Sequence, residues 1–363
     1  MKKIVKGIVI FLGVIIVALL VYAGYLLLGF HRLPDNLTLE VNRSGEAESF
    51  DEDFEVEPDT TYRIITYNIG FGAYLPDFSF FMDGGKSSWA KSEESVIANV
   101  AAMGSALNRL EPDFLFLQEV DRDGTRSYHV DELEIMNKFI GSYEYHFAQN
   151  YDSPYLFFPP WEPHGTNVAG VVTYSKGQIQ EAVRRSLPIS ESLTKFMDLD
   201  RCYSISRIPT KDGHFLCLYN VHLAAYGSSA EVREGQLAML YEDMTADYEK
   251  GNYVICGGDF NHNMKDESPA DAPEWAHTFP YETIPEGFDM AINYALNAED
   301  IAHNSCRSAD EPYQEGQTFT ITLDGFIVSD NVEVTDYKHI DLGYGYSDHD
   351  PVEMYFVLDS KEK

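Results

Sequence analysis

The chain has 363 residues, 44% of them hydrophobic, and a formal net charge of −33. This size and apolar content suffice for one large globular domain or two ordinary ones, and the acidic charge argues against a broad basic face for nucleic acid. None of the four cysteines forms a C-x-x-C pair, so neither a zinc site nor a thiol redox motif is indicated.

The N-terminal segment predicts a membrane span. Lysines precede an uncharged run from Gly7 to Phe30, which is longer than the roughly 20 apolar residues that cross a bilayer. Because the run exceeds a signal-peptide core and lacks a small-residue cleavage motif, we expect residues 1–30 to form a cytoplasmic stub and a single-pass signal anchor. The lysines orient the N-terminus toward the cytoplasm and place the remaining chain outside the cell. A cleaved signal peptide, followed by secretion, is the alternative.

Residues 31–60 are polar and acidic, as in a solvated linker, with a short strand expected near 36–41. Residues 61–363 are expected to form the globular domain. Strands are predicted at 62–70, 114–121, 145–150, 169–176, 178–185, 202–208, 214–222, 253–256, 319–329, 332–339 and 352–358, and helices at 92–110, 131–140 and 231–248. The helices fall between groups of strands, which favours a sandwich of sheets with outer helices.

The short connections predict which strands are neighbours. Lys211-Asp212-Gly213 is a good hairpin turn. The expected neighbours are 202–208 with 214–222, 169–176 with 178–185, and 319–329 with 332–339. Residues 151–164 are expected to be a loop rich in aromatic residues and prolines. Residues 263–317 are expected to form long loops around the site, with one short helical stretch at 290–296.

Polar residues at the ends of predicted strands suggest a metal–phosphate site. The clearest case is Gly257-Gly258-Asp259-Phe260-Asn261, where two glycines allow close backbone approach after a buried strand. The full set is Asn68, Glu119, His222, Asp259, Asn261, Asp324, Asp348 and His349. Taken singly, each has an ordinary interpretation, such as a turn residue or a satisfied core histidine. Their conjunction along one chain favours a phosphate-processing site.

In this order the motifs resemble those of the endonuclease/exonuclease/phosphatase superfamily, the deoxyribonuclease I-like metal-dependent phosphohydrolases, over residues 61–358. Arg233 and Gln236 also match that family's pattern. The resemblance implies an α/β (α+β) fold, a four-layer αββα sandwich of two mixed β-sheets with outer helices and the site at one rim. Here one N-terminal transmembrane helix precedes it.

The resemblance also implies roles for the individual side chains. Glu119 would be the principal metal ligand, with Asn68 nearby and Asp348 as a further metal or water ligand. Hard oxygen ligands suit Mg²⁺ or Mn²⁺, with Ca²⁺ as an alternative. Asp259 would orient or deprotonate the attacking water and Asn261 would hold the phosphate.

The two histidines would act on the phosphoryl group. His349, paired with Asp324, would serve as general base or as a stabiliser of the transition state, and that pairing favours its charged form. His222 would donate to a non-bridging oxygen. No acid that would support His222 is identifiable.

The chain departs from the family pattern near Gly170, where an expected amide is missing and Asn167, slightly earlier, is the candidate substitute. Tyr155 and Trp161 are candidate substrate-binding residues, because exposed aromatic side chains can stack on bases or insert at a lipid surface. A third interpretation is that they cover the edge of a sheet.

The sequence therefore predicts a membrane-anchored extracellular phosphohydrolase that depends on a divalent metal, with a nuclease-like or sphingomyelinase-like phosphodiesterase favoured. The substrate, nucleic acid or phospholipid headgroup, stays open, and no protein partner is indicated. The alternative is a non-catalytic surface-binding protein that keeps the fold, although such a protein usually loses some of the catalytic side chains.

Overall fold

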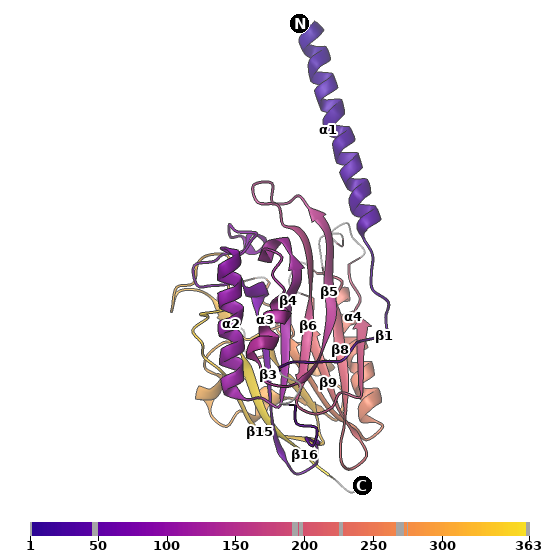
Figure 1. Cartoon of the computed structure of the whole chain (residues 1–363), viewed down its shortest axis with the longest axis vertical. Helices are drawn as coiled ribbons and strands as arrows, with labels where there is room; N and C mark the ends of the chain where they lie inside the picture. Colours follow the sequence, from indigo (N-terminus) through magenta and orange to yellow (C-terminus); the bar gives the residue numbers. More distant parts are fainter. Residues whose placement is uncertain are drawn as a thin grey trace.

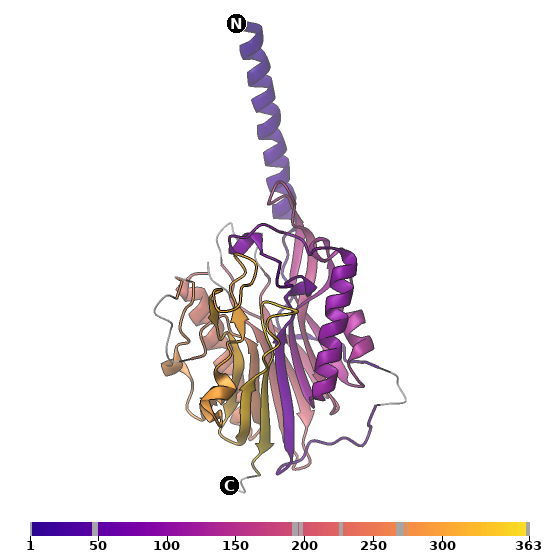
Figure 2. The ribbon, with the colours of Figure 1, turned by 90° about the vertical axis from the view of Figure 1, so that its left-hand side faces the viewer.

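The computed structural model describes residues 2–45, 50–190, 195, 199–224, 228–265, 272–273 and 275–360. Within them two mixed seven-stranded sheets lie face to face, and helices cover both outer surfaces (Figure 1 and Figure 2). The predicted four-layer αββα sandwich is thus confirmed.

The strands follow a fixed order across each sheet. The first sheet contains β1 (Leu37–Thr38), β7 (Glu181–Ser186), β8 (Cys202–Pro209), β9 (Phe215–His222), β10 (Tyr253–Asp259), β14 (Asp324–Ser329) and β11 (Phe288–Met290). The second contains β15 (Val332–His339), β16 (Val352–Leu358), β3 (Thr61–Asn68), β4 (Phe114–Gly124), β6 (Gly165–Ser175), β5 (Glu144–Leu156) and β2 (Asn42–Arg43). A separate two-stranded ladder joins β12 (Cys306–Arg307) to β13 (Thr320–Ile321).

Each sheet has a parallel pair at its centre, β9 with β10 and β3 with β4. The carboxyl ends of parallel neighbours lie at the same edge, so polar residues that follow these strands are brought together at one rim.

The outer layers are three capped helices. They are α2 (Glu93–Leu110) and α3 (Glu132–Phe139) beside the second sheet, and α4 (Ala230–Tyr248) beside the first. The N-cap residues are Ser92, Asp131 and Ser229, and the side chain of each accepts the backbone N–H of the residue three positions further along the chain. Each cap contributes about 1 kcal/mol.

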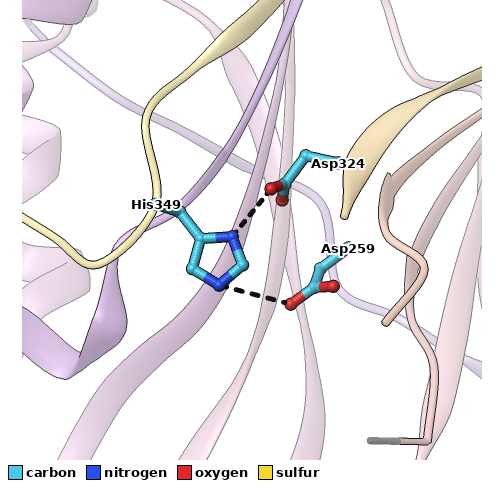
Figure 3. A group of neighbouring side chains, drawn as sticks. All are labelled: Asp259, Asp324 and His349. Atoms are coloured by element: carbon cyan, nitrogen blue, oxygen red, sulfur yellow. Dashed lines mark hydrogen bonds and ion pairs between the residues drawn. The ribbon is translucent and has the colours of Figure 1, made fainter. Parts of the chain in front are cut away.

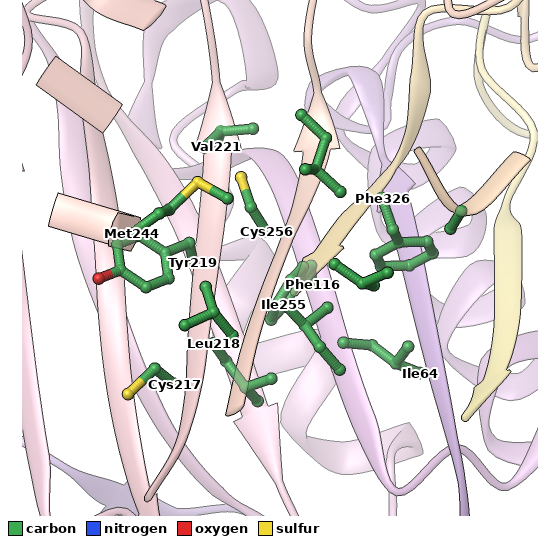
Figure 4. Packing of buried hydrophobic residues seen from close by; sticks show 14 of the residues in the cluster. Ile64, Phe116, Cys217, Leu218, Tyr219, Val221, Met244, Ile255, Cys256 and Phe326 are labelled. Carbon is green, nitrogen blue, oxygen red and sulfur yellow. The ribbon is translucent and has the colours of Figure 1, made fainter. Parts of the chain in front are cut away.

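Hydrophobic side chains fill the space between the sheets. Ile64 and Phe116 of the second sheet pack toward Leu218, Ile255 and Phe326 of the first, and all of them are buried (Figure 4). Burying a side chain of this size stabilises the fold by roughly 1.5–3 kcal/mol. This packing fixes the position of one sheet relative to the other at the rims of the sandwich.

Two predicted strand neighbours are wrong. β6 lies in the second sheet but β7 lies in the first, and likewise β14 lies in the first but β15 in the second. In both places the short connection crosses the sandwich instead of forming a hairpin. Hydrophobic pattern identifies a strand but not the sheet that buries it. The predicted β8–β9 hairpin is confirmed.

The segment 31–60 adds an edge strand to each sheet, since β1 pairs with β7 and β2 pairs with β5. The region 151–164 is also more ordered than expected, because β5 continues to Leu156 along β6. Pro154 is tolerated there because β2 covers the other side of β5 only near Tyr145. The short helical stretch at 290–296 is a 3₁₀ turn, η7 (Ala291–Tyr294).

Among the described residues one helix, α1 (Lys2–Gly29), is long and apolar enough to cross a bilayer. None of its side chains is buried, and it projects away from the sandwich (Figure 1 and Figure 2). Both a signal anchor and a signal peptide take this form.

Candidate active site

The site begins at the carboxyl end of β10, where glycines bring three strands together. Gly258 has φ of 140°, and a Cβ there would lie 2.1 Å from the Val221 carbonyl oxygen of β9. At Gly257 a Cβ would lie 2.3 Å from the Phe326 ring of β14. Only glycine allows this approach. Asp259, the next residue, is then placed directly between its two neighbouring strands.

Register fixes which side chains flank Asp259. It stands opposite His222 on β9 and opposite Asp324 on β14. Residues directly opposite in neighbouring strands share one face of a sheet, with Cβ atoms about 5 Å apart. The first sheet therefore presents two carboxylates and an imidazole as a row on its rim.

Glu119 enters from the facing sheet through a β-bulge. The β4–β6 register shifts between Leu117 and Val120, and Glu119 has a positive φ of 55°. A bulge redirects a side chain that regular pairing would place elsewhere, and a non-glycine residue at positive φ is strained. Here the strain points the Glu119 carboxylate across the gap toward the first sheet.

Asn68, at the end of β3, joins the two sheets. Its Nδ2 donates to Glu119 Oε1 at 3.3 Å and to Asp259 Oδ2 at 3.0 Å, and its Oδ1 accepts the Gly70 N–H at 3.0 Å. In this arrangement Asn68 fixes the spacing between Glu119 and Asp259. A direct metal-ligand role for Asn68 stays a prediction.

His349 forms the closest histidine–carboxylate contact of the cluster (Figure 3). Its Nδ1 lies 2.7 Å from Asp324 Oδ2, and its Nε2 lies 3.8 Å from Asp259 Oδ2. All three side chains are buried. Ser305 Oγ donates to the same Asp324 oxygen at 2.7 Å and thereby fixes the carboxylate that orients the ring.

His222 faces the same centre from β9. Its Nε2 lies 3.6 Å from Asp259 and 4.0 Å from Glu119, and its buried Nδ1 has no hydrogen-bond partner among the described residues. Asn261, held by its backbone N–H to Asp259 and by its Nδ2 to the Leu223 carbonyl, lies beside it.

A cavity of about 480 Å³ opens over these residues. Of the predicted set it is lined by Glu119, His222, Asp259, Asn261, Asp348 and His349. Asn68 and Asp324 lie behind that wall and hold it. Arg233 and Gln236 lie further out, bonded to the backbone of Ser228 and of Pro188 and Ala224, so they brace the segment after β9.

Burial and neighbouring charges shift the pKa values of the acids and histidines in this cluster. Burial raises the pKa of Asp259 to about 7, although the charge of His349 opposes the rise. Burial also raises the pKa of Glu119, against the pull of Arg126. Burial alone would lower the pKa of His349, but the charge of Asp324 outweighs it and the pKa is raised well above its usual value. Burial and the neighbouring Arg201 lower the pKa of His222 well below its usual value.

The pKa shifts therefore favour the charged form of the His349 ring and the neutral form of the His222 ring. Groups shifted in opposite directions within one cavity are typical of a catalytic site.

The donor set fits a divalent cation. Asp259, Asp324 and His349 place potential ligand atoms within 4.8 Å of one another, although the raised pKa of His349 disfavours the neutral ring that a cation needs. On the opposite side the Asp348 charge adds to the effect of burial in raising the pKa of Glu119. A divalent ion relieves such repulsion, and oxygen-rich ligand sets select Mg²⁺, Mn²⁺ or Ca²⁺.

Several lining residues were missed by the sequence analysis. They are Asp83, Arg126, Asn150, His164, Arg201, Trp275 and Arg307. Only Asn150 carried a usable signal, because it ends the predicted strand 145–150 in the same way that Asn68 ends β3. The arginines carried none: Arg126 follows β4, and Arg201 precedes β8, at positions that read as ordinary surface.

The three candidate substrate-binding residues do not line the cavity. Asn167 is buried and holds loops together, accepting the Arg126 N–H at 3.2 Å and donating to the His164 carbonyl at 3.2 Å. Tyr155 and Trp161 lie at the far end of the β5–β6 hairpin, where Trp161 is 70% exposed. Their roles in substrate binding stay predictions.

Two facing mixed sheets, with carboxylates and histidines gathered at one rim, define a phosphoesterase fold. The chain belongs to the endonuclease/exonuclease/phosphatase family, whose sequence profile matches residues 65–349. Membership suggests phosphoester hydrolase activity, and the buried Asp–His cluster is consistent with the metal site typical of the family. A search of the curated proteins found no match.

Solved structures share the fold at low identity. An endonuclease/exonuclease/phosphatase from Beutenbergia cavernae is 16% identical, with a TM-score of 0.57 over 82% of this chain and 72% of that one. D. rerio TDP2, solved with a single strand DNA product, is 16% identical, with a TM-score of 0.53 over 82% and 99%. A family member from Bacteroides vulgatus is also 16% identical, with a TM-score of 0.52 over 83% and 100%.

Proposed function

We propose that this protein is a membrane-anchored extracellular phosphodiesterase that depends on Mg²⁺ or Mn²⁺. The observation that carries the proposal is the convergence, around one cavity, of the Glu119–Asp348 carboxylates and the Asp259–His349–Asp324 group. The anchor is α1, the only helix in the described chain that is long and apolar enough to span a bilayer.

Glu119 and Asp348 would hold the cation, which supplies Lewis-acid stabilisation of negative charge on the phosphoryl oxygens. Asp259, with a pKa of about 7, is close to the ideal value for accepting a proton from an attacking water at neutral pH. The His349 imidazolium, held by Asp324, donates a charged hydrogen bond to the phosphoryl group.

His222 and Asn261 would donate further hydrogen bonds to the phosphate. With its proton on Nε2, neutral His222 donates toward the cavity without adding a second positive charge. The Asn261 amide uses one N–H on the Leu223 carbonyl, which leaves the other available for a phosphate oxygen.

Hydrolysis of bis-p-nitrophenyl phosphate with Mg²⁺ or Mn²⁺ tests this function. Wild type should turn over the ester, Glu119→Ala and His349→Ala should lose at least about 10²-fold in kcat/KM, and chelation should abolish the wild-type rate. Glu134→Ala and His129→Ala are matched controls, because both side chains are exposed and contact only neighbouring surface charges. Equal rates in all variants would contradict the proposal. Metal binding without turnover of any phosphoester would favour a non-catalytic surface-binding protein.

A further inference from the structure

Three aromatic side chains stand exposed on the connection between β5 and β6. Phe157, Phe158 and Trp161 are 59%, 57% and 70% exposed. We call them the aromatic tip. Large aromatic residues gathered on one exposed turn indicate a surface that is covered by a partner or by lipid.

The base of the aromatic tip is bonded to α1. Tyr22 Oη donates to the Tyr155 carbonyl at 3.1 Å and accepts the Phe157 N–H at 3.0 Å. Tyr25 Oη accepts the Tyr155 N–H at 2.9 Å. The Tyr22 and Phe157 rings meet edge to face at 5.4 Å. In both views the hairpin rises to the level of the last turns of α1 (Figure 1 and Figure 2).

These contacts set the depth of the tip relative to the anchor. Tyr22 lies about 10 Å along the helix axis from Gly29, at a rise of 1.5 Å per residue. Because about 20 residues fill the hydrocarbon core, the last turns of an apolar helix this long reach the headgroup layer. Tyrosines such as Tyr22 and Tyr25 concentrate at that layer. A tip bonded to them lies at the same depth.

The tip is continuous with the mouth of the cavity. The Phe158 ring packs on Phe81 at 5.8 Å, and Phe81 packs on His164 at 5.6 Å. His164 and the neighbouring Met82, which is 57% exposed, both line the cavity. The active-site rim and the membrane-proximal end of the molecule are thus the same end.

We propose that the aromatic tip lies in the headgroup layer of the bilayer that α1 crosses, and that it holds the mouth of the cavity against that surface. The substrate class is then the phosphodiester headgroup of a membrane lipid. A net charge of −33 repels anionic surfaces, so the lipid is zwitterionic. This inference rests on the proposed function: its chemistry needs the phosphodiesterase activity, whereas the position of the tip needs only the α1 anchor.

The position is tested on the full chain reconstituted in zwitterionic vesicles. Trp161 fluorescence should be quenched by lipids brominated near the glycerol end of the acyl chains and less by lipids brominated near the chain terminus. The Trp161→Phe variant isolates the signal, since the remaining Trp89 and Trp275 are only partly exposed, whereas Trp161 is 70% exposed. Equal emission loss in wild type and Trp161→Phe would overturn the proposal, whether or not the protein is an active enzyme.

The substrate class is tested with the double variant Phe157→Ser, Phe158→Ser in the same vesicles. Release of headgroup phosphate should fall at least tenfold, while hydrolysis of soluble bis-p-nitrophenyl phosphate should stay within twofold of wild type. Leu296→Ser is the matched control, because Leu296 is 66% exposed and lies on another loop. An equal loss on both substrates, or turnover of oligonucleotides but not of vesicle lipid, would overturn the lipid assignment. Loss of activity on every phosphoester would instead contradict the proposed function while leaving the quenching result standing.

Discussion

The two walls of the cavity are built in different ways. The strand wall carries Glu119 at the bulge within β4 and His222 and Asp259 at the ends of β9 and β10, and all three strands are paired on both sides. The loop wall is the segment 340–351 between β15 and β16, which carries Asp348 and His349. Continuous main-chain ladders position the first wall, whereas an isolated backbone bridge between Cys306 and His349 and several side-chain contacts position the second.

Asp350 is central to the loop wall. Its buried carboxylate accepts the Leu342 and Tyr344 N–H groups, each at 3.1 Å, and contacts His303 Nε2 at 2.8 Å. The Arg307 N–H, from the neighbouring ladder, donates to the Asp348 carbonyl at 2.8 Å. His349 is therefore held by one backbone bridge together with polar side chains outside the cavity, whereas Asp259 lies in continuous ladders on both sides.

This difference predicts where each wall is vulnerable. In the strand wall, damage requires either loss of a reacting side chain or insertion of an atom between strands. In the loop wall, loss of a single remote hydrogen-bonding group is enough to displace the imidazole. The following substitutions test that contrast, beginning with the largest expected effect.

Asp259→Asn removes the proposed proton acceptor and keeps the shape of the side chain. We expect kcat to fall by about 10³-fold, within the range for loss of a general base, because Asn cannot accept the water proton at neutral pH. Steady-state kinetics on a chromogenic phosphodiester measure the loss, and an unchanged thermal midpoint shows that the strand wall is intact. A loss below about tenfold would exclude Asp259 as the base.

Gly258→Ala tests the strand wall itself. The added Cβ would lie 2.1 Å from the Val221 carbonyl oxygen, a backbone atom that cannot move alone. We expect destabilisation of about 3 kcal/mol or more by denaturant unfolding. Gly213→Ala is the control: Gly213 also has positive φ, at 88°, but nothing lies within 4 Å of an added Cβ. It should cost only about 1 kcal/mol. Equal costs at both positions would refute close approach as the reason for Gly258.

Asp324→Asn tests how the loop wall is coupled to the strands. Loss of the carboxylate should lower the pKa of His349 and reduce activity by about 10²-fold. The His349 pKa is raised on folding, so its stabilising effect is complete below pH 6.5 and disappears as pH rises through the folded pKa. The alkaline limb of the pH–rate profile should therefore move to lower pH in the variant. An unshifted alkaline limb would show that Asp324 does not control the titration of His349.

Asp350→Asn tests the remote support of the loop wall. All three contacts are made by Asp350 Oδ2, so the amide oxygen keeps an acceptor there but loses the negative charge opposite His303. We expect kcat to fall about tenfold with KM nearly unchanged, since each weakened bond costs about 1 kcal/mol. Arg63 and Glu353, an ion pair on β3 and β16, provide the contrast. Glu353→Gln should lower the free energy of unfolding but not the rate of the folded enzyme. If Glu353→Gln lost activity and Asp350→Asn did not, Asp350 would not be the residue that supports the loop wall.

Metal binding should depend on pH through the carboxylates of the strand wall. The pKa of Asp259 rises from 3.8 to about 7 on folding, so in that window the metal-free folded state binds the extra proton and loses stability as pH rises. Saturating Mg²⁺ should therefore raise Tm by a few degrees more at pH 8 than at pH 5. Glu119→Ala should remove this difference, and a larger shift at pH 5 would contradict the assignment.

The strands of this protein could be predicted closely because their cores are continuous apolar runs. Val352–Leu358 is a strand over the predicted range, and the 202–208 with 214–222 hairpin pairs as expected. The two wrong predictions of neighbouring strands have one cause. The residues of a strand such as 332–339 do not indicate which of the two sheets contains it. The order of strands in a sandwich depends on contacts between residues far apart in the sequence.

The residues of the candidate site also fall into two groups, those that could be predicted from the sequence and those that could not. Residues that follow strands, such as Asp259 and His222, could be proposed from local pattern, because strand ends collect at a rim. Arg126 and Arg201 could not, because only packing brings them into the cavity wall. The direction of the Glu119 side chain could not be predicted either, because the bulge that sets it arises from the β4–β6 register.

By itself the sequence determined the apolar N-terminal helix, the strands, and the order of polar residues that carries the family resemblance. All of these are local properties of hydrophobicity, turn chemistry and residue type. Tertiary structure alone decided which strands share a sheet, which side chains enter the cavity, and that α1 and the aromatic tip meet at the rim that holds the site. Those relations are set by contacts across the molecule, and such contacts have no representation in any short stretch of chain.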